Sequence, residues 1–266
     1  MSFYAGIDVG SLTADAVVID EDEKIISYAI LPTGSDSQRA ATEAFKAALL
    51  QGGLSQGDVV RVVSTGYSRA RVREAKDSRT EIACHARGGL YLFPDVGTIV
   101  DIGGQDSKAI LIGKGGRVVN FAMNDKCAAG TGRFLEVMAS ALDIPLDKMD
   151  ELAFESQEGL TISSTCTVFA ESEVVSLISQ GKKPRDISMA VSRAIARRTA
   201  GLATRVGVKD QVVMTGGVAK NRAVVRLLSE DIGHPIRVPD EPQIVGALGA
   251  AIIARESDGD LGDKGL

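Results

Sequence analysis

Short apolar runs alternate along the chain with longer segments in which apolar positions recur at helical spacing. Runs rich in Val, Ile and Ala are typical of buried strands, whereas an apolar residue every three or four positions predicts an amphipathic helix. The first part of the chain predicts strands at 25–31 and 59–65 and helices at 38–51 and 80–91. Because strands and helices alternate, the pattern predicts an α/β fold.

The same alternation continues along the rest of the chain. It predicts further strands at 98–102, 107–112, 118–123 and 211–215, and further helices at 131–142, 168–180, 187–206, 222–230 and 245–255. The last of these helices carries small residues on one face. The segment 256–266 after it is polar and rich in Gly and Asp, so we expect a flexible tail there.

Two segments, 6–19 and 99–112, repeat each other at a constant offset of 93 residues. Each consists of an apolar strand, an Asp, a Gly-rich turn and a second apolar strand. The residues that coincide are Asp8 with Asp101, Gly10 with Gly103 and Ala16 with Ala109. The repeat predicts two similar domains. We expect the first to comprise 1–94 together with the C-terminal helix 245–255, and the second to comprise 95–244.

Composition narrows the class of protein. Of the 266 residues, 44% are hydrophobic and 24% are charged, as in globular proteins, and the net charge of −5 argues against a nucleic-acid partner. No apolar run approaches the roughly 18–20 residues of a membrane span, and the N-terminus lacks the features of a signal peptide. Three cysteines, an odd number, argue against a disulfide framework. We therefore expect a cytoplasmic protein without membrane association.

The two repeated turns are candidate phosphate-binding sites. The chain contains neither a GxxxxGKS/T loop nor a GxGxxG turn after a strand. Backbone N–H groups and hydroxyls in the turns 10–14 and 103–105 can instead donate to phosphate oxygens, and Asp8 and Asp101 at the strand ends can hold Mg²⁺. The alternative is that both are plain hairpins with Gly at positive φ. The pair, together with Gly216–Gly217 after a third strand, favours nucleotide binding.

Two of the three cysteines lie in segments rich in Gly, Ser and Thr, immediately ahead of predicted helices. Cys127 lies in the segment 124–132, and Cys166 lies in the segment 163–173. The positive end of a helix dipole favours the thiolate, which binds metals and does redox chemistry. Neither cysteine belongs to a CxxC pair. A cluster with four cysteine ligands is possible if two chains, related by a twofold axis, each give two thiolates.

Other roles remain open for these and neighbouring residues. Free cysteines are often small buried apolar residues, and Cys84, inside a predicted helix among apolar neighbours, fits core packing. A cluster within one chain that uses Cys84 as a ligand is a third possibility. His85 and His234 lack the spacing of metal ligands. The basic residues of the run Arg193–Arg205 are typical of a solvated helix face, or of a docking surface for an acidic electron donor.

Several of these motifs resemble those of one protein superfamily. Asp8–Ser11, Asp101–Gln105 and Met214–Val218 resemble the two phosphate motifs and the adenosine motif of the actin, sugar-kinase and heat-shock-chaperone ATPases. The segments 124–132 and 163–173 resemble one branch in particular. That branch comprises the ATP-dependent activators (component A) of 2-hydroxyacyl-CoA dehydratases, the related ATPase subunits of benzoyl-CoA reductase and the reductases of double-cubane cluster proteins.

The resemblance extends from Phe3 to Arg255 and implies both a fold and a function. The fold is a pair of actin/sugar-kinase-like (ribonuclease H-like) domains that flank a nucleotide cleft. The function is ATP-hydrolysing transfer of one low-potential electron to an iron–sulfur dehydratase or reductase, which is thereby activated. Alternatives are the ATPase subunit of a benzoyl-CoA-type reductase and, from other classes, a small-molecule kinase or a chaperone-like ATPase switch of the same fold.

The resemblance also implies cofactors and partners. One 4Fe-4S cluster would lie between the two chains of a homodimer, with Cys127 and Cys166 of each chain as ligands. ATP or ADP and Mg²⁺ would complete the cofactors. Ferredoxin or flavodoxin would be the electron donor, and an iron–sulfur dehydratase or reductase would be the acceptor.

Individual roles follow for the residues of the expected nucleotide site. Asp8 and Asp101 would be the carboxylates on the metal side, and Asp101 or Gln105 would orient the attacking water. Gly130–Gly132 would lie between the nucleotide and Cys127. The residues expected to contact the nucleotide are Gly10, Ser11, Leu12, Thr13, Ala14, Gly103, Gly104, Gln105, Gly130, Thr131, Gly132, Gly216, Gly217, Asn221 and Gln243.

One residue departs from the family pattern. The family usually carries Lys in the first phosphate turn, where this chain has Asp15, whereas the second copy has Lys108 at the matching position. If Asp15 faced the phosphates, it would repel them, and Mg²⁺ or another cation would have to compensate. If Asp15 faced solvent, little would change.

Overall fold

The computed structural model describes residues 1–125, 127–163 and 166–259. These residues form two compact units. The first comprises 1–95, 113–118 and the C-terminal segment from 243, and the second comprises 96–112 and 119–242. Parts of the expected segments 124–132, 163–173 and 256–266 lie outside the described residues, namely 126, 164–165 and 260–266.

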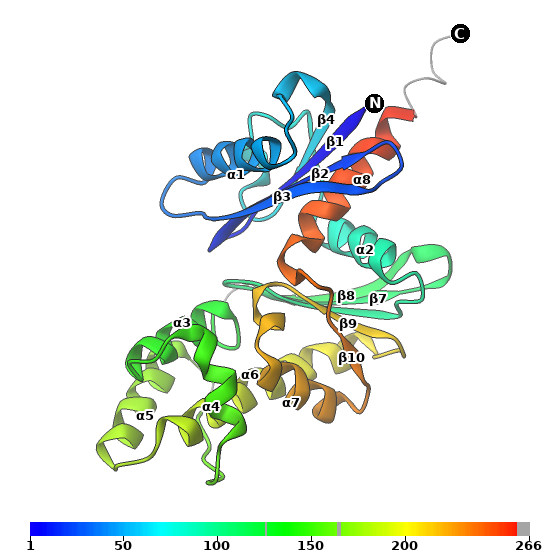
Figure 1. Cartoon of the computed structure of the whole chain (residues 1–266). Coiled ribbons are helices and arrows are strands. Elements are labelled where there is room, and N and C mark those ends of the chain that lie inside the picture. Colours follow the sequence, from blue (N-terminus) through cyan, green and yellow to red (C-terminus); the bar gives the residue numbers. More distant parts are fainter. Residues whose placement is uncertain (126, 164–165, 260–266) are drawn as a thin grey trace. The chain divides into compact units, whose positions relative to one another are not determined.

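The first unit is built on a mixed five-stranded sheet in the order β3-β2-β1-β4-β5 (Figure 1). Its strands are β1 (Phe3–Val9), β2 (Thr13–Asp20), β3 (Ile25–Pro32), β4 (Val59–Thr65) and β5 (Asp77–Ser78). The first three form an antiparallel meander, and β4 and β5 continue the sheet in parallel from β1. The sheet therefore combines local hairpins with crossover connections, as α/β folds do.

Helices pack on both faces of this sheet. Helix α1 (Ser37–Gln51) buries Phe45 and a row of alanines against the face that carries Ile7 and Val18. Helices α2 (Glu81–Leu92) and α8 (Val245–Gly259) contribute to the opposite cluster, which contains Tyr4 and Ile19. Each face thus has its own apolar core.

Glycines allow α8 to approach its neighbours closely. A Cβ atom at Gly249 would overlap the carbonyl oxygen of Cys84 in α2, and a Cβ atom at Gly6 in β1 would overlap the carbonyl oxygen of Ala247. The small residues that the sequence shows along this helix therefore serve backbone-to-backbone packing.

The second unit repeats the strand arrangement of the first. Its sheet has the order β10-β9-β6-β7-β8, in which the β6–β7 hairpin corresponds to β1–β2. The strands are β6 (Thr98–Ile102), β7 (Ser107–Ile112), β8 (Val118–Asn124), β9 (Val212–Thr215) and β10 (Ile236–Arg237). The cross-strand registers also agree, because Asp8 pairs with Asp15 and Asp101 pairs with Lys108. The internal repeat in the sequence is therefore a repeat of structure.

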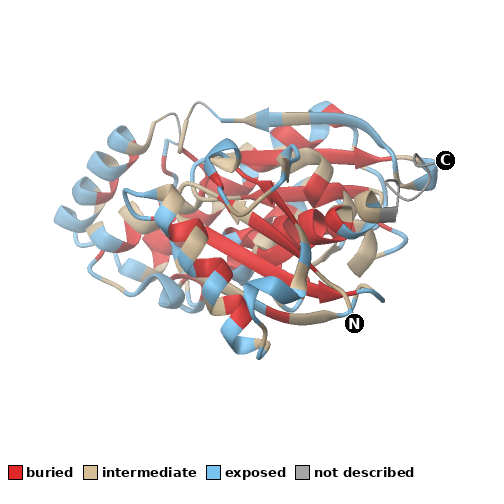
Figure 2. Cartoon of the chain, turned by 90° about the horizontal axis from the view of Figure 1, so that it is seen from above, coloured by how far each residue is buried: buried red, intermediate tan, exposed pale blue. Residues whose placement is uncertain are grey.

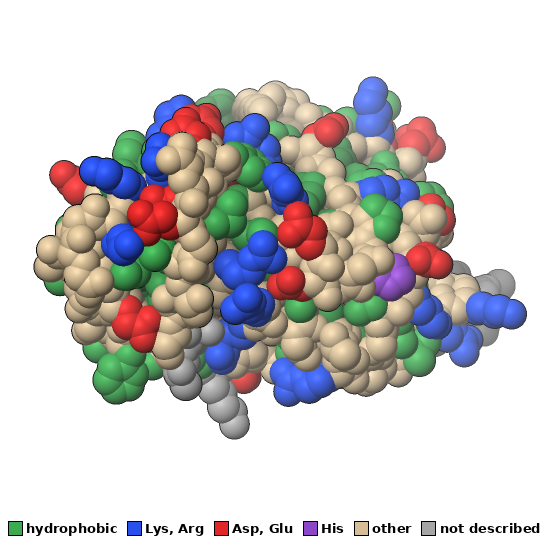
Figure 3. Space-filling view, turned by 90° about the horizontal axis from the view of Figure 1, so that it is seen from below, with side chains coloured by type: hydrophobic (Ala, Val, Ile, Leu, Met, Phe, Trp, Pro, Cys, Tyr) green, Lys and Arg blue, Asp and Glu red, His purple; other side chains and the backbone are tan. Residues whose placement is uncertain are grey.

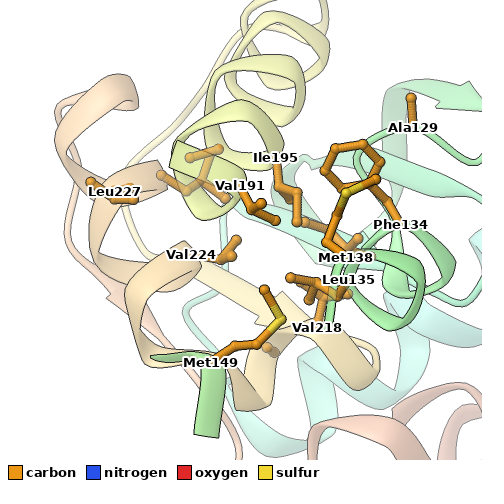
Figure 4. Packing of buried hydrophobic residues seen from close by; sticks show 14 of the residues in the cluster. Ala129, Phe134, Leu135, Met138, Met149, Val191, Ile195, Val218, Val224 and Leu227 are labelled. Atoms are coloured by element: carbon orange, nitrogen blue, oxygen red, sulfur yellow. The ribbon is translucent and has the colours of Figure 1, made fainter. Parts of the chain in front are cut away.

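Five helices complete the described part of the second unit. They are α3 (Gly132–Ala141), α4 (Met149–Phe154), α5 (Thr167–Ser179), α6 (Pro184–Val206) and α7 (Arg222–Ile232). Phe134 and Met138 of α3, Ile195 of α6 and Val224 of α7 belong to one buried cluster (Figure 4). Strands β6, β7 and β9 are buried along their whole length, whereas the helices expose their outer sides (Figure 2).

The predicted α/β fold is confirmed, and the ends of the long predicted elements lie within four residues of the observed ones. Helix α4 and the two-residue strands β5 and β10 were not expected, because they are too short for a periodic pattern. The expected flexible tail is wrong for residues 256–259, which belong to α8. Among the described residues, no helix combines the length and apolar character needed to cross a membrane.

Candidate functional site

The first repeated turn connects β1 to β2 and is held by hydrogen bonds at both ends. The Gly10 N–H donates to the carbonyl oxygen of Thr13 at 2.9 Å. Thr33, at the end of β3, braces the turn from outside, because its hydroxyl donates to the Gly10 carbonyl at 2.9 Å and its N–H donates to the Leu12 carbonyl at 2.8 Å. The expected nucleotide contacts 10–14 thus lie on one ordered turn of the first unit.

Asp8 and Asp15 lie opposite each other across the β1–β2 hairpin. Residues directly opposite on antiparallel strands direct their side chains to the same face. Asp15 is only 6% exposed, and its carboxylate accepts a hydrogen bond from the Thr13 hydroxyl at 3.2 Å. The solvent-facing alternative for Asp15 is therefore wrong, since its side chain is buried beside the turn.

A third segment of the first unit, at the end of β4, lies against the Asp8 carboxylate. Thr65, at the end of β4, is the parallel partner of Asp8, and Gly66 follows it with φ of +92°. A Cβ atom at Gly66 would overlap Asp8 Oδ1, and a Cβ atom at Gly246 of α8 would overlap Asp8 Oδ2. The Asp8 carboxylate therefore fills a space that two glycines leave open.

Sequence reasoning missed Thr65 and Gly66. The signal is a second short repeat, since Val62–Gly66 reads Val-Val-Ser-Thr-Gly and Val212–Gly216 reads Val-Val-Met-Thr-Gly. Both segments run along a strand that lies parallel to the first strand of its own unit, and both end in a glycine with positive φ.

The second repeated turn has the same geometry with different charges. The Gly103 N–H donates to the Asp106 carbonyl at 3.0 Å. Asp101, 2% exposed, forms an ion pair with Lys108 at 3.2 Å and accepts a hydrogen bond from the Thr215 hydroxyl at 2.8 Å. Lys108 also pairs with Asp106 at 2.8 Å. Asp101 is thus held in place inside the unit, whereas Gln105 at the turn is exposed.

Three hydrogen bonds join the second turn to the start of α3. The N–H groups of Gly132 and Arg133 donate to the carbonyl oxygens of Gly103 and Gly104, at 2.9 and 2.8 Å. The hydroxyl of Thr131, which is fully buried, lies 2.9 Å from the Gly104 carbonyl oxygen and 2.6 Å from that of Ala128. The structure therefore brings the expected contacts 103–104 and 130–132 together.

Cys127 and Cys166 are both partly exposed free cysteines of the second unit. Cys166 is the N-cap of α5, and its carbonyl accepts the Ala170 N–H at 3.0 Å. Cys127, by contrast, precedes the first residue of α3 by five positions, because Gly130 has φ of +85° and Thr131 is the N-cap. The expectation that both cysteines lie at helix starts is wrong for Cys127, so the helix-dipole argument applies to Cys166 alone.

Helix α5 also differs from the expected amphipathic helix. Among its residues, Val168 and Phe169 are about two-thirds exposed, and Val175 is about half exposed. Only Ala170 and Val174 are buried. The helix that begins at Cys166 therefore presents apolar side chains outward.

The remaining expected nucleotide contacts lie in two places. Gly216 has φ of +82°, and its N–H donates to the Pro242 carbonyl at 2.9 Å. Gly217 begins the short helical turn that follows, and Asn221 caps α7 by accepting the Val224 N–H at 2.9 Å. Gln243 belongs to the first unit, in the turn ahead of α8.

Cys84 is a core residue of the first unit. It is fully buried in α2, and this burial raises the pKa of its thiol to about 12. A thiol that resists ionisation is a poor metal ligand, which supports the core-packing interpretation. Within the described ranges, no three His, Cys, Asp or Glu side chains of one chain gather where they could hold a metal ion.

The basic run along α6 is largely neutralised at its start. Arg193 pairs with Glu230 at 3.6 Å and with Asp231 at 3.4 Å on α7. Arg222 likewise pairs with Asp150 at 2.6 Å. Acidic side chains lie among the basic ones on the face drawn in Figure 3. Arg193, the first arginine of the run, is therefore neutralised by acidic side chains of α7.

Comparison with known proteins decides the family. The model of the BadF/BadG/BcrA/BcrD ATPase family matches residues 5–254. The chain belongs to this family. It is 46% identical over 258 residues to the activator of lactoyl-CoA dehydratase from Anaerotignum propionicum, covering 96% of this chain and 98% of the relative. It is 42% identical over 256 residues to the (R)-2-hydroxyglutaryl-CoA dehydratase activating ATPase from Acidaminococcus fermentans, covering 96% and 98%.

Solved structures agree with this assignment. The ADPNP-bound activator of 2-hydroxyisocaproyl-CoA dehydratase from Clostridium difficile matches with a TM-score of 0.93 at 39% identity and covers 99% of both chains. A glucokinase of the ROK family from Streptomyces griseus matches with a TM-score of 0.58 at 14% identity, covering 96% of this chain and all of the other. The second match concerns the fold alone and confirms the sugar-kinase-like architecture.

Proposed function

We propose that this protein is an ATP-hydrolysing iron–sulfur electron-transfer protein that reduces and thereby activates a dehydratase or reductase. Membership of an ATPase family and the ADPNP-bound relative support ATP binding and hydrolysis. The names of the relatives support a dehydratase as the partner. The observation that carries the proposal is the hydrogen-bonded junction between the second turn and the start of α3, the segment that follows Cys127.

The nucleotide part of the proposal assigns phosphate contacts to the turns 10–14 and 103–105 and adenosine contacts to Gly216, Gly217, Asn221 and Gln243. Asp8 and Asp101 would be the carboxylates that hold Mg²⁺, directly or through water. Because Asp101 is buried and held by Lys108 and Thr215, its role is to fix the turn and the metal-bound waters. The exposed Gln105 is the better candidate for orienting the attacking water.

The cluster part of the proposal rests on the cysteines. Cys127 and Cys166 are unbridged, partly exposed and carried by the same unit. Two thiolates from each chain fit half of a Cys₄ ligand set, so a twofold homodimer would complete it. Outward-facing Val168 and Phe169 beside Cys166 are suited to a contact between chains. When bound, the cluster would supply a one-electron carrier.

The coupling part of the proposal uses the junction. Three hydrogen bonds join the turn 103–105 to Thr131–Arg133, so a nucleotide that moves this turn would also move Thr131–Arg133. These residues begin the helix that follows the Cys127 loop. A small displacement at the phosphates thereby reaches the segment that carries a cluster ligand. We further propose a cytoplasmic setting, with ferredoxin or flavodoxin as the electron donor and a dehydratase or a double-cubane cluster protein as the acceptor.

Electron paramagnetic resonance of the reduced protein tests this coupling. We expect the cluster signal to change when ATP and Mg²⁺ are added. In Thr131→Val, which keeps the side-chain shape but removes the hydroxyl donor, we expect a smaller change. Thr204→Val is the matched control, because the Thr204 hydroxyl donates only within α6, to Ala200. A signal that nucleotide leaves unchanged in the unaltered protein would sink the proposed coupling.

Activity assays on the same protein preparation distinguish the proposed activator from a kinase of the same fold. A kinase needs no iron and transfers phosphate to a small substrate. Phosphotransfer to a sugar or acid by metal-free protein would favour the kinase, whereas ATP-dependent reduction of an iron–sulfur acceptor would favour the activator.

A further inference from the structure

The two repeated hairpins carry opposite charges at the same position. In the second unit, the row across the sheet is Lys108, Asp101 and Thr215, and it contains a buried ion pair. In the first unit, the corresponding row is Asp15, Asp8 and Thr65. The exchange of Lys for Asp lowers the formal charge at this one position by two units. Asp106, which also pairs with Lys108, has the neutral Thr13 as its counterpart, so the first turn as a whole is more negative than the second by one unit.

The geometry directs this charge toward the turn. Asp8 and Asp15 are direct cross-strand partners, and such residues have Cβ atoms about 4.5–5.5 Å apart on one face of the sheet. Asp15 is 94% buried and is hydrogen-bonded to Thr13, a member of the turn itself. Burial limits screening by salt, so the field of this carboxylate acts on whatever binds at residues 10–14.

We infer that Asp15 is a specificity-determining residue that makes the first turn select a nucleotide carrying a divalent cation over the free nucleotide. This inference rests on the proposed nucleotide site. A carboxylate repels a ligand in proportion to the negative charge of that ligand. Free ATP carries more negative charge than its Mg²⁺ complex, so Asp15 penalises free ATP more strongly. A lysine at this position would instead attract both forms.

The test compares ATP binding by the complete protein with and without Mg²⁺, measured by calorimetry for the unaltered protein, Asp15→Asn, Asp15→Lys and Asp22→Asn. Asp15→Asn keeps the shape of the side chain and removes its charge. Asp22 is exposed in the turn at the opposite end of β2, so Asp22→Asn makes the same change in net charge far from residues 10–14. Circular dichroism identifies any variant that fails to fold.

The measured quantity is the ratio of the dissociation constants for ATP without and with Mg²⁺. We expect Asp15→Asn to lower this ratio roughly tenfold, mainly by strengthening the binding of free ATP, and Asp15→Lys to lower it further. Asp22→Asn should leave it unchanged. A folded Asp15→Asn variant with the ratio of the unaltered protein would overturn the inference while leaving the proposed function intact. Absence of nucleotide binding by the unaltered protein under both conditions would overturn both.

Discussion

Three cysteines of similar appearance in the sequence differ in their surroundings. Cys84 is fully buried in the core of the first unit, and burial raises its pKa to about 12. Cys127 and Cys166 are partly exposed in the second unit. The difference assigns packing to the first cysteine and leaves the other two available as ligands.

Thiol labelling of iron-free, reduced protein checks this assignment. We expect Cys127 and Cys166 to react with a thiol reagent in the folded state and Cys84 to react only in denaturant, since the thiolate is the reactive form. Cys84→Ser should therefore leave the number of fast-reacting thiols unchanged. A lower number of fast-reacting thiols in Cys84→Ser would show that Cys84 is accessible.

Single residues were predictable from the sequence where a repeat exposed them. The agreement between Asp8 and Asp101 identified both hairpin turns. Thr65, which neighbours Asp8, was missed because the five-residue repeat that relates it to Thr215 is short and its two copies lie 150 residues apart. The burial of Asp15 could not be predicted, because it depends on the packing of the sheet.

At the scale of elements, glycines decide how closely helices and strands approach. Gly249 of α8 faces the backbone of α2, and the oxygen that an added Cβ would meet is a carbonyl, which a side-chain rotation cannot move aside. Gly201 of α6 is exposed and meets nothing within 4 Å. The two helical glycines thus have opposite roles, although both appear as helix-weakening residues in the sequence.

Substitution by alanine should separate these two roles. We expect Gly249→Ala to lower the free energy of unfolding by about 1–3 kcal/mol, the usual cost of overpacking. Gly201→Ala should raise it by roughly 0.5–1 kcal/mol, because alanine is the better helix former. Equilibrium unfolding in urea measures both changes. Stabilisation of Gly249→Ala would show that α8 is free to move away from α2.

The start of α3 shows where sequence reasoning about elements ends. The apolar periodicity places the start of the helix to within one residue, and the positive φ of Gly130 and the extended Thr131 keep the preceding residues out of the helix, so that Cys127 lies five residues ahead of it. Those loop residues bond to the neighbouring turn at Gly103 and Gly104. Periodicity predicts a helix from its apolar face, whereas its first residue depends on contacts with other parts of the chain.

At the scale of the whole molecule, the two structural repeats differ in the charged residues beside their turns and in their cysteines. The first unit places Asp15 where the second has Lys108, and the second unit alone carries the two candidate ligand cysteines. The family assignment covers residues 5–254 and therefore both repeats. We propose that these features belong to an ATPase in which hydrogen bonds connect the second turn to the segment that follows Cys127, a ligand of a shared cluster.

Analysis of iron and acid-labile sulfide in anaerobically purified protein tests this account most directly. We predict about four irons and four sulfides for every two chains, because one Cys₄ cluster would be shared. Cys166→Ser should lose the cluster and retain nucleotide affinity, whereas the matched variant Cys84→Ser should retain both. Metal-free protein that still activates its partner with ATP would contradict the account.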